Sequence, residues 1–172
     1  RNDNQKVAEH QRLFYDNVFF PYLDEHNITN VIDLGDTFDR RKFISYTSLK
    51  SAKEMFFDPL KERNVNTHII VGNHDITYKN TLEVNSIYLL LDGYDNCHEC
   101  GTPQTINIDG LDILLMPWIC RDNFDLCWSE IRNSRAQILM GHLELNGFQM
   151  YKGMPSYEGF DAEEFSKFDV VC

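Results

Sequence analysis

The sequence lacks the features that are typical of membrane-spanning proteins, of secreted proteins and of proteins that bind nucleic acid over a broad basic surface. No apolar run reaches the roughly 20 residues that a membrane-spanning helix needs, and no signal-peptide pattern opens the chain. The five cysteines are odd in number and do not have the spacing of a disulfide framework, which favours a reducing compartment. We therefore expect a cytoplasmic protein that has no membrane partner.

Basic residues are scarce as well. The chain has 16 Lys and Arg against 27 Asp and Glu, for a formal net charge of −11. This balance argues against a broad, sequence-independent surface for nucleic acid. It does not exclude a carboxylate-rich metal centre, because divalent cations would offset part of the charge.

What is present is the composition of a globular protein. The 172 residues are 42% hydrophobic and include 12 Phe and 8 Tyr, enough to bury a core. We expect one domain over residues 1–172, without repeats or linkers. The chain starts at Arg1 and stops at Cys172 inside an apolar stretch that resembles a strand, so we expect a fold that is truncated at both ends.

Hydrophobic periodicity predicts strands that alternate with helices. Pro21 and Pro59 should each interrupt a helix, and Thr47 is the expected N-cap of the second helix. Asp109-Gly110 is the strongest hairpin signal. The expected helices cover residues 4–26, 47–63, 86–93 and 121–133, and the expected strands cover residues 30–34, 67–71, 104–108, 111–116 and 136–140. This order predicts an α/β layered domain with mixed sheets.

Three of these strands end in glycine followed by a side chain that can bind a metal. The three junctions are Gly35-Asp36, Gly72-Asn73-His74-Asp75 and Gly141-His142. Carboxylate, amide and imidazole ligands suit Mn, Fe or Zn better than Ca, and two such ions can activate a water and clamp a phosphoester. Taken singly, Asp36 could be a turn carboxylate and His142 a core or surface histidine. The hydrolytic metal centre is favoured because the three junctions occur together.

The ordered motifs resemble those of the calcineurin-like metallophosphoesterases. Within that superfamily the chain is most similar to the SbcD-type DNA repair nucleases, a branch that includes the bacteriophage recombination endonuclease subunit. The likeness also includes Leu115-Met116-Pro117-Trp118 and the stretch from Gly141 to Met154. The resemblance implies an α-β-β-α sandwich of the metallophosphatase type.

The resemblance also implies roles for individual residues. Asp36 would bridge two metal ions, and Asn73 and His142 would each ligate one. His74 would stabilise the phosphate charge or protonate the leaving oxygen, oriented by Asp75.

Three further residues receive supporting roles from the resemblance. Asp39 would support the loop as an outer carboxylate. Arg40 and Arg41 are candidate phosphate contacts, for which a solvated basic pair is the alternative.

The family further implies two bound divalent ions. Mn is the expected metal, and Fe, Zn or Mg are the alternatives. It implies DNA as substrate in recombination or repair, an SbcC-type ABC ATPase as partner, and a homodimer. In the printed sequence no strand that carries Asp-x-His precedes Asp36, and no Gly-His-x-His follows His142, although these two motifs begin and end the family's ligand set. We therefore expect the 172-residue chain to lack the first and last motifs and to be inactive by itself.

Two other functions stay open at this point. A phosphomonoesterase or cyclic-nucleotide phosphodiesterase would use the same motifs on another substrate. A partner-docking module with a vestigial site would keep the residues without catalysis. The lone Cys97-His98-Glu99-Cys100 is expected to be structural or incidental, because a structural zinc site normally needs a second cysteine pair.

Overall fold

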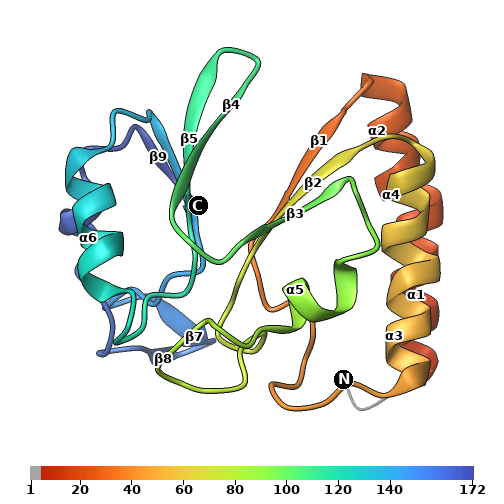
Figure 1. The fold of residues 1–172 in the computed structure, drawn as a ribbon, viewed down its shortest axis with the longest axis horizontal. Helices are drawn as coiled ribbons and strands as arrows, with labels where there is room; N and C mark the ends of the chain where they lie inside the picture. Colours follow the sequence, from red (N-terminus) through yellow and green to blue (C-terminus); the bar gives the residue numbers. More distant parts are fainter. Residues whose placement is uncertain (1–4) are drawn as a thin grey trace.

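The structure, a computed structural model, describes residues 5–172. Two larger β-sheets face each other between layers of helices, and residues 149–155 form a separate two-stranded antiparallel sheet (Figure 1). The helices within residues 5–62 cover the outer face of one sheet, and the helix Phe124–Asn133 covers the outer face of the other (Figure 1). The expected α/β class, an α-β-β-α sandwich, is confirmed, with one parallel sheet and one mixed sheet. Within residues 5–172 no helix is both long enough and apolar enough to cross a membrane.

The helices are α1 (Gln5–Phe14), α2 (Phe20–His26), α3 (Tyr46–Ala52), α4 (Asp58–Glu62), α5 (Ser86–Leu91) and α6 (Phe124–Asn133). The strands are β1 (Asn30–Asp33), β2 (Asn66–Ile70), β3 (Cys97–Cys100), β4 (Gln104–Ile108), β5 (Leu111–Met116), β6 (Ile138–Gly141), β7 (Gln149–Tyr151), β8 (Met154–Pro155) and β9 (Val170–Val171).

The two predicted long helices are present, each with a π-helical segment in the middle. Tyr15–Phe19 separates α1 from α2, and Lys53–Phe57 separates α3 from α4. Pro21 and Pro59 lie in the first turns of α2 and α4, directly after these segments, and each lacks the N–H that would bond back into the preceding turn. The prolines therefore coincide with local widening of a continuous helix. Residue 4 of the first predicted helix lies outside the described residues.

The predicted N-cap Thr47 is wrong. Ser45 takes this position, with an extended backbone (φ −71°, ψ 147°) and a side chain that accepts from the Ser48 N–H at 3.0 Å. Thr47 lies inside α3. The hydroxyl of Ser45 precedes the first turn and can reach an N–H that has no intrahelical partner, which a residue within the turn cannot do in the same way.

The first sheet is parallel in the order β1-β2-β3. Strand β3 contains the Cys-x-x-Cys sequence and was not predicted from the sequence. Cys97 packs on the helix side, whereas Cys100 is buried between the sheets, so the two thiols are on opposite faces. Burial raises the pKa of Cys97 to about 11 and that of Cys100 to about 12. These cysteines are placed as packing residues, not as a chelating pair.

The second sheet has the order β4-β5-β6-β9 and is mixed. Its antiparallel β4–β5 hairpin turns at Asp109 and Gly110, both with positive φ (52° and 86°), as the Asp-Gly signal predicts. Strand β5 is buried on both faces because Leu114 packs toward α6 and Leu115 packs between the sheets. This explains its continuous apolar run.

Lys167 closes the carboxyl end of α6. Its Nζ donates to the carbonyl oxygens of Ile131 (3.0 Å), Arg132 (2.8 Å) and Ser134 (2.8 Å). Lys167→Met keeps much of the side-chain volume but removes the charge and the donors. We expect it to lower the free energy of unfolding by about 1–2 kcal/mol, measured by urea denaturation.

The matched control for this variant is Lys152→Met, at an exposed lysine between β7 and β8. It should leave the urea midpoint unchanged. Equal midpoints for both variants would show that Lys167 does not stabilise the end of α6.

Candidate metal centre

The candidate site lies where the carboxyl ends of strands from both sheets meet. β1 leads to Asp36, β2 leads to Asn73, and β6 ends at Gly141, just before His142. In Figure 1 these strand ends lie at the same end of the sandwich. The Trp118 N–H donates to the Val71 carbonyl at 2.9 Å and thereby ties the loop after β5 to the end of β2. Residues that are far apart in sequence are thus held side by side.

The structure brings the three predicted metal ligands together. His142 Nε2 lies 3.5 Å from Asp36 Oδ1 and 3.0 Å from Asn73 Oδ1. The other ring nitrogen of His142, Nδ1, lies 2.8 Å from the Leu34 carbonyl. A carbonyl can only accept, so Nδ1 carries the proton and Nε2 presents its lone pair toward Asp36 and Asn73. This is the tautomer that a metal ligand requires.

The Asn73 amide fits its position in two orientations. In one, its nitrogen donates to His142 Nε2 (3.0 Å) and to the Asp36 carboxylate (3.2 and 3.3 Å), and its oxygen accepts from Arg41 Nη2 (3.0 Å). In the other, its oxygen faces His142 and Asp36, and three electron-pair donors converge without a hydrogen between them. A cation would satisfy that second arrangement.

Asp36 has an unusual backbone for a residue with a side chain. Its φ is 55°, a left-handed conformation that Asp and Asn adopt more readily than other L-residues. In this conformation Asp36 Oδ1 accepts from the His74 N–H at 2.7 Å. The backbone of Asp36 also packs against Gly72, where a Cβ would lie 2.5 Å from Asp36 Oδ1 and closer still to its backbone nitrogen. Glycine at position 72 allows this approach.

His74 is oriented by the loop that follows Asp36. Its Nδ1 lies 2.9 Å from the Asp39 carbonyl, so Nδ1 is the protonated nitrogen. This contact is made by the backbone carbonyl of Asp39. Support of the loop by the Asp39 carboxylate stays a prediction. The neighbouring Arg40 has its guanidinium 4.8 Å from the centre of the Phe43 ring.

Asp75 has a different set of contacts from the one that the resemblance implies. Its side chain is buried and accepts from the backbone N–H groups of Gly72 (2.9 Å) and Asp36 (2.8 Å). Burial raises the pKa of Asp75, and these hydrogen bonds act in the opposite direction. The contact that orients the His74 ring comes from Asp39, not from Asp75.

Two residues near the centre received no site role from the sequence, although Trp118 belongs to a stretch that carries the family likeness. Asp33 accepts from the Gly35 N–H (2.9 Å) and the Thr37 hydroxyl (3.3 Å), and burial raises its pKa. A carboxylate inside an apolar strand, two residues before Gly35, was the available signal. Trp118 meets the His142 ring edge to face with centroids 5.9 Å apart. No local pattern indicates that contact.

The residues present fit a divalent cation. Asp36, Asn73 and His142 supply carboxylate oxygen, amide oxygen and imidazole nitrogen, and His142 is in the required tautomer. Among the described residues no group of three or more His, Cys, Asp or Glu is arranged to hold a metal. The amide of Asn73 is therefore needed as the third donor from this chain.

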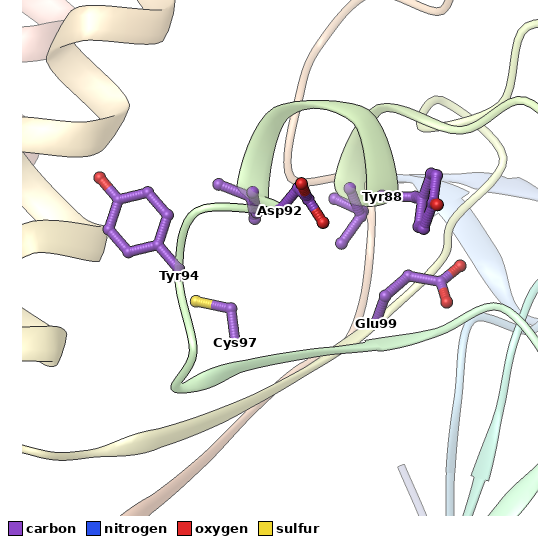
Figure 2. A pocket seen from close by; sticks show the side chains of 7 residues that line it. Tyr88, Asp92, Tyr94, Cys97 and Glu99 are labelled. Carbon is purple, nitrogen blue, oxygen red and sulfur yellow. The ribbon is translucent and has the colours of Figure 1, made fainter.

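A cavity of about 140 Å³ lies elsewhere, between α5 and β3 (Figure 2). Figure 2 shows Tyr88, Asp92, Tyr94, Cys97 and Glu99 around it. Its two carboxylates would repel a phosphate, and the raised pKa of Cys97 keeps that thiol protonated near neutral pH. The cavity is therefore a poor candidate for binding a phosphoester.

Comparison with known proteins identifies the class to which this fold and site belong. Residues 9–172 match the calcineurin-like phosphoesterase family, and the chain belongs to that family. The resemblance seen in the motifs is thus confirmed.

Exonuclease subunit 1 of Enterobacteria phage T4 is 40% identical to the chain over 136 residues, which are 79% of this chain and 40% of that protein. The chain thus spans less than half of this relative. A solved structure of a novel archaeal phosphodiesterase aligns with 78% of this chain and 68% of its own, at 16% identity and a TM-score of 0.40. Similarity at that level does not by itself establish a common fold.

Proposed function

We propose that the full-length polypeptide is a metal-dependent phosphodiesterase that cleaves DNA in recombination or repair. The observation that supports this most is the convergence of Asp36, Asn73 and His142 at one end of a calcineurin-like fold, beside His74. The relative in phage T4 is an exonuclease subunit, which favours a nucleic-acid substrate over a small phosphate ester. Residues 1–172 are proposed to form a single domain of this enzyme.

In this proposal Asp36, Asn73 and His142 hold the metal. Asp36 has two carboxylate oxygens and in this proposal would bridge two ions. When bound, two divalent ions would activate a water and neutralise charge on the phosphate. Mn²⁺ is the expected ion, and Fe, Zn or Mg are the alternatives. Three ligands are few for two ions, so we propose that residues 1–172 alone are inactive.

His74 is proposed to act on the phosphate. The Asp39 carbonyl holds Nδ1–H, and the Asp36 carboxylate holds the backbone N–H, so the ring has a fixed orientation. Nε2 is then the atom that would donate to a phosphate oxygen or protonate the leaving oxygen. Arg40 and Arg41 flank this loop and would supply local positive charge on a chain whose net charge is −11.

We also propose that the protein works with a partner. The phage relative is one subunit of an exonuclease, which supports a second subunit here, such as an SbcC-type ABC ATPase. A homodimer and a cytoplasmic location belong to the same proposal.

The decisive variant is His74→Ala in the full-length polypeptide. We expect its turnover of linear DNA with Mn²⁺ to fall by about 10²–10³-fold, because one preorganised donor to the transition state is lost. Its affinity for Mn²⁺, measured by calorimetry, should stay close to that of the parent, since His74 is not among the proposed ligands.

His10→Ala, at an exposed histidine of α1, is the control and should keep full activity. Unchanged cleavage by His74→Ala would refute the role of His74. Faster turnover of a small aryl phosphate than of DNA by the parent would refute the nuclease and favour a phosphomonoesterase.

A further inference from the structure

Among residues 5–172, Asp75 is the buried residue that carries a carboxylate, and it is 1% exposed. Oδ2 accepts from the Asp36 N–H (2.8 Å) and the Gly72 N–H (2.9 Å). Oδ1 accepts from the Phe38 N–H (3.3 Å) and the Ser86 hydroxyl (3.4 Å). The carboxylate thus joins three segments: the loop after β1, the turn after β2 and the start of α5.

The contact with Asp36 is the one that bears on the metal centre. The N–H that Asp75 accepts belongs to the residue with the left-handed backbone. Aspartate tolerates this conformation, and the bond to Asp75 is a contact that holds Asp36 in it. The Asp36 carboxylate points toward His142, with its Oδ1 3.5 Å from His142 Nε2. The direction of this carboxylate therefore depends on the backbone conformation of Asp36.

Burying Asp75 in this place is unfavourable by itself. Asp36 lies close by, and two carboxylates near each other repel. An apolar side chain would avoid that repulsion but would leave the N–H groups of Asp36, Gly72 and Phe38 without this acceptor. The carboxylate is therefore placed to satisfy these three donors together.

We infer that Asp75 is a positioning residue, whose buried carboxylate fixes the backbone of Asp36 and thereby aims the Asp36 carboxylate at Asn73 and His142. This role acts directly on the metal ligand, and it reaches His74 only through the Asp36 carboxylate that accepts the His74 N–H. It rests on the proposed function, since the aim of Asp36 matters only if Asp36 binds a metal.

The test compares Asp75→Asn with the parent in the full-length polypeptide. Asparagine has nearly the same shape as aspartate, but an amide NH2 group replaces one carboxylate oxygen. This group is a donor and would face the N–H groups that Asp75 accepts. We expect Mn²⁺, titrated by calorimetry, to bind about 10–100-fold more weakly, as when an outer partner of a ligand is lost. In the metal-free protein, hydrogen exchange at the Asp36 amide should become faster.

A purely structural role would lower the thermal midpoint and leave both readouts unchanged in the folded protein, and that result would overturn the inference. The two readouts also separate the inference from the proposed function. A parent that binds no Mn²⁺ refutes the metal centre, whereas faster exchange at Asp36 in the variant still supports the positioning role.

Two further variants complete the experiment. Ser86→Ala removes only the 3.4 Å contact and keeps the carboxylate, so it tests the site even if Asp75→Asn fails to fold. It should weaken Mn²⁺ binding by less than Asp75→Asn does and speed exchange at the Phe38 amide more than at Asp36. Asp92→Asn, on the exposed end of α5, removes the same charge and should change neither readout.

Discussion

Replacing Asp36 by asparagine is expected to abolish metal-dependent activity of the full-length polypeptide. The asparagine can keep the 2.7 Å bond from the His74 N–H through its oxygen, so the loop is preserved. It loses the negative charge and one of the two oxygens that are proposed to bridge the ions. The affinity for Mn²⁺ should therefore fall by more than the roughly 10–100-fold typical of an outer partner of a ligand. Calorimetric titration and a DNA cleavage assay measure the two effects.

The matched control is Asp109→Asn, at the exposed tip of the β4–β5 hairpin. It changes the net charge equally and keeps a residue type that tolerates the observed φ of 52°. This variant should bind Mn²⁺ as the parent does. Unaltered Mn²⁺ affinity in Asp36→Asn would remove Asp36 from the ligand set and with it the centre of the proposal.

Gly72→Ala is the second change with a large expected effect. The added Cβ would lie 2.5 Å from Asp36 Oδ1 and 3.1 Å from His142 Cε1, in addition to its overlap with the Asp36 backbone. Because two proposed ligands must move, we expect loss of Mn²⁺ binding together with about 1–3 kcal/mol of destabilisation from overpacking. Thermal unfolding without metal and Mn²⁺ titration separate the two contributions.

Gly93→Ala provides the comparison, since a Cβ at that position meets nothing within 4 Å. It should keep the metal affinity of the parent and leave stability equal or slightly higher. If Gly72→Ala behaved like Gly93→Ala, the close approach of Gly72 to Asp36 would have no functional importance.

Much of the fold could be predicted because its signals are local. The run that ends at Val71 and the Asp109-Gly110 turn depend on neighbouring residues, and both are found where the sequence places them. Strand β3 could not be predicted in this way. Its residues Cys97–Cys100 include His and Glu, and they become a strand because β2 offers a parallel edge with which they pair.

The same distinction applies to the metal centre, whose candidate ligands were predictable from local sequence while other contacts were not. Glycine followed by Asp36, Asn73 or His142 at strand ends is a pattern in the sequence itself, and it was sufficient to predict which residues would gather. The partners of Asp75 were not predictable from its position beside His74. Its acceptor atoms bond the Asp36 N–H, 39 residues away in the chain.

The sequence by itself determined the family, the alternation of strands and helices, and the candidate ligands, because these depend on residue type and spacing along the chain. Only the tertiary structure decided the tautomer of His142, the support of His74 by the Asp39 carbonyl and the contacts of Asp75. The physical reason is that a hydrogen bond requires a donor and an acceptor within about 3 Å, and folding selects that pair from the whole chain.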